Sequence, residues 1–316
     1  MKTFSEFNIK NLVLRNRVVL PPMCMYSSDN EGLVSPFQQS HYMSFATGGV
    51  GLIILEATGI QPNGRISSND LGIWNDSQMN SLKQLVVQCQ SLGSKVAIQL
   101  SHAGRKCRAD VEYIVAPSSI SHDSTYRLPK ELTTKEIKDI VQSFRNASLR
   151  VNEAGFDAVE LHGAHGYLIH QFLSPISNKR TDEYGGSLEN RVRFLKEILI
   201  SISEVWPKEK ILALRVSAYE YIEGGVTPHS ISEIINFVKD LGLDLIDVSS
   251  VGNVLVRMKP YPGYQLGFAK IVKDLTNLPV IAGGLITDLK MASYALESKQ
   301  ADMGFLGRAL LRDPYL

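Results

Sequence analysis

The sequence has 316 residues, with 33 Lys and Arg against 32 Asp and Glu, a pI of about 7.7 and no block of like charges. This balance indicates that neither nucleic acid nor an anionic membrane is the main partner. No stretch reaches the roughly 18 apolar residues of a membrane span, and the N-terminus lacks the apolar core of a signal peptide. We therefore expect a cytoplasmic protein that works on small molecules.

Eight short apolar runs have the composition of buried β-strands, and each ends in a polar or glycine-rich turn. These runs cover residues 17–20, 52–56, 96–100, 158–162, 211–216, 245–248, 280–282 and 303–306. Segments with helical periodicity lie between them, at residues 37–47, 77–92, 133–154, 188–205, 228–241, 264–275 and 288–297. Thr133, followed three residues later by Glu136, has the spacing of a capping box, and Gly155 and Gly242 follow predicted helices.

The alternation of apolar strands with helices predicts a parallel sheet that is covered on both faces. Eight such units favour a closed (β/α)8 barrel, the TIM barrel, as a single domain over residues 1–316. The sequence ends shortly after the eighth strand, so we expect the eighth helix to be largely missing. The loops after strands one, three, four and six are long, and in such barrels these loops build the active site.

Two glycine-containing turns follow the last two predicted strands. Gly283 and Gly284 come after strand seven, and Gly307 and Arg308 come after strand eight. Glycine lets backbone N–H groups approach an anion, and barrels often bind phosphate at these two loops. The pattern favours a phosphate site completed by the Arg308 guanidinium over two ordinary turns. No Gly-x-Gly-x-x-Gly follows a strand, so a resident nicotinamide domain is not predicted.

Two polar residues lie inside apolar strands. Arg215 is costly to bury unless it meets an anion, and we leave open whether it faces a flavin or pairs with Glu160 or Glu56. Gln99 has the groups to hydrogen bond a ring amide, but a satisfied core glutamine is an equal alternative.

A cluster of proton-capable groups follows strand four. His162 and His165 are three residues apart, and a helical turn over residues 163–165 would bring both imidazoles and the Tyr167 phenol together. Two imidazole N–H groups can polarise a carbonyl oxygen, and a phenol can protonate a carbanion. A metal site of Glu160, His162 and His165 is the alternative, although the spacing fits no common ligand pattern. Ordinary loop histidines are a third interpretation.

Three cysteines, Cys24, Cys89 and Cys107, are scattered and form no Cys-x-x-Cys pair, so we expect reduced thiols and neither a disulfide nor a metal. Cys24 and Tyr26 follow the first strand, where a thiol could touch a flavin. The surrounding methionines favour the simpler interpretation of Cys24 as a small core hydrophobe.

Several long motifs in order resemble the Old Yellow Enzyme family, and most closely its thermophilic-like class. They are Pro22-Met23-Cys24-Met25-Tyr26, Gln99-Leu100-Ser101-His102-Ala103-Gly104-Arg105-Lys106, His162-Gly163-Ala164-His165-Gly166-Tyr167-Leu168, and Arg180-Thr181-Asp182-Glu183-Tyr184-Gly185-Gly186-Ser187 with Glu189-Asn190-Arg191. The resemblance covers essentially the whole chain. It implies an FMN-binding barrel that uses NADPH to reduce the activated C=C bond of enones and enals by a ping-pong hydride transfer through flavin N5.

The resemblance also implies residue roles. The flavin ring and ribityl chain would contact Pro22, Met23, Ala57, Gln99 and Arg215, and the phosphate would contact Gly283, Gly284, Gly307 and Arg308. His162 and His165 would bind the substrate carbonyl, Tyr167 would donate the proton, Cys24 would tune the flavin, and Tyr26 and Ile66 would shape the substrate pocket. The resemblance thus implies a functional role for Cys24, whereas its neighbours alone favour a small core hydrophobe.

Relatives of this class form homo-oligomers and continue past the eighth strand into a tail that supplies an arginine to the neighbouring subunit. This sequence ends before such a tail, so both features stay open. Two alternative functions remain: a metal-dependent barrel lyase or hydrolase, and a barrel that binds flavin without catalysis.

Overall fold

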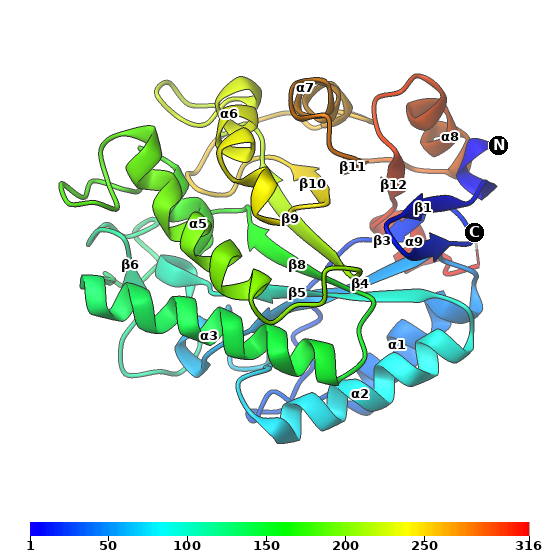
Figure 1. Ribbon diagram of the computed structural model, residues 1–316, viewed down its shortest axis with the longest axis horizontal. Coiled ribbons are helices and arrows are strands. Elements are labelled where there is room, and N and C mark those ends of the chain that lie inside the picture. The colour runs from blue at the N-terminus through cyan, green and yellow to red at the C-terminus, as the bar shows by residue number, and fades with distance from the viewer. Residues whose placement is uncertain (316) are drawn as a thin grey trace.

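A closed barrel of eight parallel strands forms the centre of the molecule, and helices cover its outside (Figure 1). The computed structural model describes residues 1–315. The barrel strands are β3 (Val18–Leu20), β4 (Leu52–Gly59), β5 (Lys95–Ser101), β8 (Ala158–Gly163), β9 (Ile211–Ser217), β10 (Leu245–Ser249), β11 (Val280–Ala282) and β12 (Met303–Phe305). Pairing of β12 with β3 closes the barrel. The predicted (β/α)8 architecture and its eight strands are confirmed.

The seven predicted helices are also confirmed. They are α1 (Pro36–Thr47), α2 (Asp76–Ser91), α3 (Thr134–Glu153), α5 (Leu188–Ser203), α6 (Pro228–Val238), α7 (Leu266–Thr276) and α8 (Leu289–Glu297). Thr133 and Glu136 form the expected capping box at the start of α3. Gly155 and Gly242 have φ angles of +88° and +104°, which glycine adopts at little cost. Within residues 1–315, no helix is both long and apolar enough to cross a membrane.

Several short elements were not predicted because they lack a repeating apolar pattern. An antiparallel hairpin of β1 (Phe7–Ile9) and β2 (Leu12–Leu14) precedes the barrel, and β6 (Val115–Ala116) pairs with β7 (Lys130–Glu131). Helix α4 (Leu168–Leu173) follows β8, and α9 (Arg308–Arg312) follows β12. Single 3-10 turns are η1 (Lys2–Phe4), η2 (Pro62–Gly64), η3 (Gly104–Lys106) and η4 (Lys239–Leu241).

The barrel interior changes from apolar to polar along the strands. At the amino ends of the strands, inward residues such as Leu52, Ala158 and Ile281 pack with Leu12 and Leu14 of the hairpin. Further along the same faces, the inward residues are polar. They are Gln99, Glu160, Arg215 and Asp247, all buried. The carboxyl ends of the strands therefore open onto a charged layer.

Strand β4 contains a bulge at Glu56. Leu55 lies opposite Ile98, but the next pair joins Ala57 to Gln99, so Glu56 is an extra residue. Its carboxylate accepts hydrogen bonds from Gln38 Nε2 (2.9 Å), Tyr42 Oη (3.1 Å) and the Met25 N–H (2.9 Å). The bulge thereby places the small Ala57 side chain beside Gln99.

Candidate active site

The histidine cluster forms on a tight turn after β8. The expected helical turn over residues 163–165 is wrong, because Gly163 still belongs to β8 and His165 has a left-handed φ of +57°. Gly166 has a φ of +73°, and the Tyr167 N–H donates to the Ala164 carbonyl at 3.2 Å. We call residues 164–167 the His165 turn. A turn in which both central residues are left-handed is favoured by glycine and tolerated by histidine.

The two imidazoles and the phenol converge in spite of this different backbone. The His162 ring centroid lies 5.2 Å from that of His165 and 4.7 Å from that of Tyr167. His162 Nδ1 accepts the Ala164 N–H at 3.3 Å, so its proton lies on Nε2. Burial, followed by the charges of His165 and Arg215, lowers the pKa of His162 well below its usual value. His162 is therefore a neutral donor through Nε2.

The His165 ring contacts Ser249 of β10, and Gln265 in turn contacts Ser249. His165 Nε2 lies 2.7 Å from Ser249 Oγ, which also accepts a hydrogen bond from Gln265 Nε2 at 3.2 Å. Burial and the nearby charges of Arg215 and Lys106 lower the pKa of His165 well below its usual value. If the neutral His165 ring accepts a hydrogen bond from the Ser249 hydroxyl at Nε2, its own proton lies on Nδ1.

Tyr167 packs at the edge of a small apolar cluster, beside Ile66. Burial raises the pKa of Tyr167 well above its usual value, and the nearby Cys24 and Tyr26 raise it further. The Lys106 ammonium lies 5.2 Å from the Tyr167 ring centroid. The phenol thus keeps its proton in the neutral range.

Cys24 is partly buried and is not among the residues of the apolar clusters, and its role stays a prediction. Burial raises the pKa of the Cys24 thiol, and the carboxylates of Asp70 and Glu56 raise it further. The Ala57 backbone and the Tyr26 side chain act in the opposite direction and lower the pKa of the Cys24 thiol. A neutral thiol therefore lies beside Ala57. All three cysteines are free.

Arg215 pairs with a residue that the sequence analysis did not consider. Its Nε lies 3.1 Å from Asp247 Oδ2, whereas Glu160 accepts from Gln99 Nε2 at 2.8 Å and Glu56 is turned toward α1. Burial raises the pKa of both Glu160 and Asp247, the Asp247 charge raises that of Glu160 further, and Arg215 opposes both shifts. The Arg215 guanidinium also donates to the Pro22 carbonyl at 3.4 Å.

A cavity of about 580 Å³ lies beyond the carboxyl ends of β9 to β12. Its lining includes Arg215, Ser249, Gln265, Gly284, Phe305, Gly307 and Arg308. Gly283 is absent from this lining. The ring of Phe305 fills the space that a side chain at position 283 would need, with a closest distance of 2.3 Å. A glycine at position 283 is thus required for packing, and its contact with a phosphate stays a prediction.

The cavity residues fit a phosphate-bearing cofactor. Within residues 1–315 the Arg308 guanidinium makes no ion pair and no hydrogen bond, so its fork is free for an anion. A side chain at Gly307 would approach Met23 Sδ to 3.3 Å, which places the loops after β3 and β12 side by side. The cavity therefore extends from Arg308 to Arg215 and Ser249. Arg215 donates to the Pro22 carbonyl, and Ser249 lies against His165, so both loops border this cavity through its lining residues.

A metal centre is not supported by this geometry. Among the described residues, no three His, Cys, Asp or Glu side chains are grouped so that they could hold a metal ion. Glu160 is engaged by Gln99 inside the barrel, and His165 is engaged by Ser249 on β10.

Sequence reasoning missed Asp247, Ser249 and Gln265. Asp247 had the same signal as Arg215, a charged residue inside an apolar strand, and Ser249 follows it by two residues on the same inward face. Gln265 had no local signal, because its role depends on the loop after β10 folding back over the barrel.

A barrel with a cavity for a phosphate-bearing cofactor and neutral proton donors at its mouth defines the class of flavin-dependent oxidoreductases. Residues 2–316 match the NADH:flavin oxidoreductase / NADH oxidase family, and the chain belongs to this family, with FMN as its cofactor. The resemblance to Old Yellow Enzyme is thereby confirmed.

Two curated relatives match along the whole chain. An NADPH dehydrogenase of Clostridium acetobutylicum is 54% identical over 316 residues, covering 100% of this chain and 93% of the relative. An NADPH dehydrogenase of Bacillus pumilus is 47% identical over 315 residues, covering 99% and 92%. Among solved structures, a 2-naphthoyl-CoA reductase in complex with 2-naphthoyl-CoA superposes with a TM-score of 0.95 at 26% identity. That match covers 100% of this chain and about half, 51%, of the reductase chain.

Proposed function

We propose that this flavin-dependent oxidoreductase is an ene-reductase: it uses NADPH to reduce the activated C=C bond of α,β-unsaturated carbonyl compounds in a ping-pong cycle. The observation that supports it most is the convergence of His165 and Tyr167 on His162 at the barrel mouth, with ring centroids 5.2 Å and 4.7 Å from that of His162. The names of the two NADPH dehydrogenase relatives support NADPH as the reductant.

FMN would lie along the cavity, with its phosphate at Gly284, Gly307 and Arg308 and its ring toward Pro22, Met23, Ala57, Gln99 and Arg215. The chemistry that bound FMN supplies is hydride transfer, first from NADPH and then to the alkene, at one shared site. The positive charge of Arg215 suits a ring that gains electrons, although Asp247 offsets part of that charge.

The two histidines would hold the substrate carbonyl oxygen. His162 offers Nε2–H, and His165 offers Nδ1–H because Ser249 occupies its Nε2. Two neutral donors aimed at one oxygen stabilise the negative charge that develops there when the β carbon receives a hydride. They also polarise the C=C bond before reduction.

Tyr167 would protonate the α carbon. Its raised pKa keeps the phenol protonated at neutral pH, and the ring lies against His162, which fixes it next to the bound carbonyl. The proton returns from solvent. Tyr26 is about half exposed, and Ile66 packs in the same cluster as Tyr167, so both suit a substrate pocket. Cys24 suits a role in tuning the flavin. Homo-oligomerisation stays a prediction.

Absorbance spectroscopy of the purified protein tests the proposal. We expect a flavin spectrum, loss of the yellow absorbance with NADPH under anaerobic conditions, and its return on adding 2-cyclohexenone, with formation of cyclohexanone. A flavin that NADPH bleaches but that no enone reoxidises would overturn the ene-reductase assignment. A protein that binds FMN and resists NADPH would favour the non-catalytic alternative, and a stoichiometric metal in elemental analysis would favour a lyase or hydrolase.

A further inference from the structure

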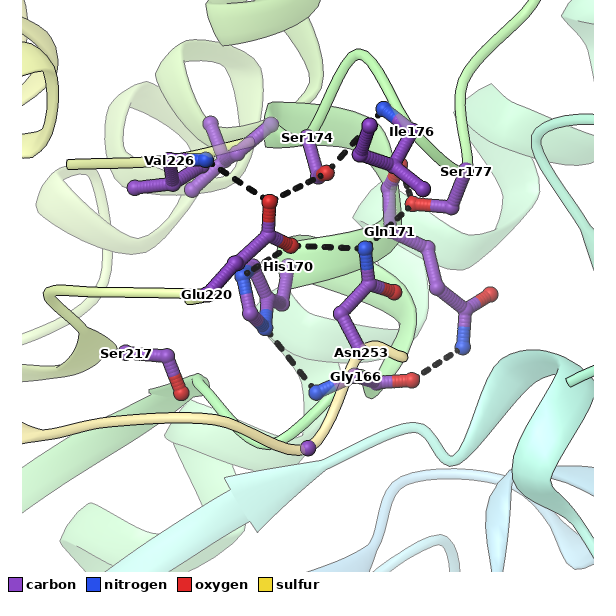
Figure 2. A network of polar contacts seen from close by, with 12 residues as sticks. Gly166, His170, Gln171, Ser174, Ile176, Ser177, Ser217, Glu220, Val226 and Asn253 are labelled. Carbon is purple, nitrogen blue, oxygen red and sulfur yellow. Dashed lines mark hydrogen bonds and ion pairs between the residues drawn. The ribbon is translucent and has the colours of Figure 1, made fainter. Parts of the chain in front are cut away.

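A fully buried carboxylate, Glu220, lies behind the active site in the loop after β9. It accepts hydrogen bonds from the Val226 N–H (2.7 Å), Ser174 Oγ (2.9 Å) and Asn253 Nδ2 (2.7 Å), and His170 Nε2 lies 3.2 Å away (Figure 2). Burial alone would raise the pKa of Glu220, but the nearby His170 and the hydrogen bonds from Val226 and Ser174 outweigh it and lower the pKa to about 2. Glu220 is therefore a permanent anion.

His170 connects this carboxylate to the His165 turn. Its Nδ1 accepts the backbone N–H of Gly166 at 2.9 Å, so the ring proton must lie on Nε2, which faces Glu220 (Figure 2). A histidine oriented by a carboxylate has a fixed tautomer and a fixed ring plane. Through His170, Glu220 thus determines the position of the peptide between His165 and Tyr167.

Asn253 connects the same carboxylate to the loop that packs against the turn. Contact between the two loops is close: a side chain at Gly166 would come within 2.3 Å of the Gly252 carbonyl, and one at Gly252 within 2.5 Å of His165 Cα. Lys106 Nζ bridges the carbonyls of His165 (2.9 Å) and Gly252 (3.0 Å). The His165 turn therefore keeps its shape only while the loop at Gly252 stays in place.

Both loops contain backbone that needs support. His165 has a φ of +57° and the β-branched Val251 a φ of +61°, in the left-handed region that such residues rarely adopt. Strained conformations of this kind persist where the surrounding contacts over-determine them, and they cluster at functional sites. Here one contact of each loop leads back to Glu220, through His170 for the turn and through Asn253 for the other loop. Lys106, Ser217 and Gln171 hold the turn in addition.

We infer that Glu220 is a positioning residue: acting through His170 and Asn253, it holds the His165 turn in the one shape that directs His165 and Tyr167 at the substrate. The effect on catalysis rests on the proposed function, but the effect on the turn does not. Glu220 touches neither substrate nor flavin. Its removal should therefore loosen one turn and leave flavin binding intact.

Hydrogen exchange of single backbone amides, followed by NMR in the FMN-loaded protein, tests the inference independently of activity. In Glu220→Gln we expect the Gly166 and Tyr167 amides to exchange at least about tenfold faster than in the wild type, because the carboxamide cannot accept all four donors. Unchanged protection of both amides in a folded Glu220→Gln protein would overturn the inference.

Asp157→Asn provides a matched control at the opposite end of the barrel. Asp157 also joins two elements, accepting hydrogen bonds from the Val96 N–H of β5 (2.9 Å) and from Gln90 Nε2 of α2 (2.9 Å). In this variant the Gly166 and Tyr167 amides should keep wild-type exchange within about twofold. If Asp157→Asn accelerated them as much as Glu220→Gln does, a general loss of stability would explain the result and the inference would fail.

A milder variant tests the inference if Glu220→Gln does not fold. Ser174→Ala removes one of the four donors and should accelerate the same two amides about threefold. Equal exchange in Ser174→Ala and wild type, when Glu220→Gln does not fold, would count against the inference.

A double-mutant cycle tests the consequence for the site. Binding of 4-hydroxybenzaldehyde is read from the flavin absorbance. Glu220→Gln should weaken this binding about tenfold in the wild-type background, but less than about twofold in the His165→Ala background. Equal losses in both backgrounds would show that Glu220 does not act through His165. Failure of the wild type to oxidise NADPH would instead refute the proposed function, and the exchange experiment would still decide the role of Glu220.

Discussion

The Nε2 atom of His165 lies 2.7 Å from the hydroxyl oxygen of Ser249, so the ring of a proposed substrate donor is oriented by a residue on a different strand. Ser249 in turn accepts from Gln265 Nε2, and the resulting chain leaves Nδ1 of His165 for the substrate. The ring of the proposed donor is thus oriented by Ser249, which Gln265 supports.

Ser249→Ala tests this arrangement. Loss of a net hydrogen bond of about 0.5 to 1.5 kcal/mol should raise the Kd of 4-hydroxybenzaldehyde roughly two- to tenfold. Ser250→Ala is a close control, because Ser250 Oγ also accepts from Gln265 Nε2, at 3.0 Å, but has no contact with His165. The two Kd values can be measured by titration of the flavin absorbance. Equal weakening in both variants would contradict the role of Ser249.

Tyr167→Phe tests the proton donor. The phenol is proposed to act only when the alkene is reduced, so 4-hydroxybenzaldehyde should bind the variant with nearly the wild-type Kd. Reoxidation of the reduced flavin by 2-cyclohexenone should slow roughly 10²- to 10⁴-fold, the usual contribution of a general acid. Stopped-flow absorbance separates this step from reduction by NADPH. An unchanged reoxidation rate would assign the proton to another group.

Arg308→Ala tests the phosphate site. Charged hydrogen bonds contribute about 1.5 to 3 kcal/mol, so FMN should bind roughly ten- to a hundredfold more weakly. Riboflavin lacks the phosphate and should bind the variant and the wild type alike, as measured by quenching of flavin fluorescence. If the affinity for riboflavin fell as far as that for FMN, Arg308 would support the fold of the cavity and not the phosphate.

Glu160→Gln tests the charged layer inside the barrel. Burial raises the pKa of Glu160, so the folded protein holds a proton that the unfolded chain releases at lower pH. The protonated Glu160 contributes its full stabilisation at pH values below the pKa of an ordinary carboxyl group. As the pH rises through the raised pKa this contribution is lost, by at most about 1.4 kcal/mol of unfolding free energy per pH unit.

Urea denaturation of the FMN-saturated proteins between pH 5 and pH 8, followed by circular dichroism, measures this difference. Wild type should lose stability across this interval relative to Glu160→Gln. Glu112→Gln, which changes an exposed carboxylate, should follow the wild type. Parallel curves for Glu160→Gln and wild type would show that Glu160 is not protonated in the folded protein.

The sequence allowed prediction of the barrel because each strand is a continuous apolar run and each helix has amphipathic periodicity, as in α3, where Ile137, Val141 and Phe144 are buried on one face. The candidate site could be predicted in part for the same reason. Its residues follow strand ends, and the carboxyl ends of parallel strands meet at one edge of the barrel.

Other features could not be predicted because they depend on tertiary contacts. Local propensity gives no reason for a left-handed His165, and the conformation follows from contacts with Gly252 and Lys106. The partners of Glu220 come from three different loops, so no spacing in the sequence connects them. Asp247, by contrast, has a signal in the sequence, because it is a charged residue inside an apolar strand.

The bulge in β4 has a consequence for protein design. If Glu56 were deleted to make β4 regular, the residues before it would keep their faces, and Ala57 would still follow Leu55 at the position opposite Gln99. If instead the strand were straightened with Glu56 retained, its carboxylate would replace the Ala57 methyl group inside the barrel. Transfer of this site to an idealised barrel therefore requires a shortened β4 or a copied bulge. Only the copied bulge keeps the hydrogen bond that the Met25 N–H, next to Cys24, donates to the Glu56 carboxylate.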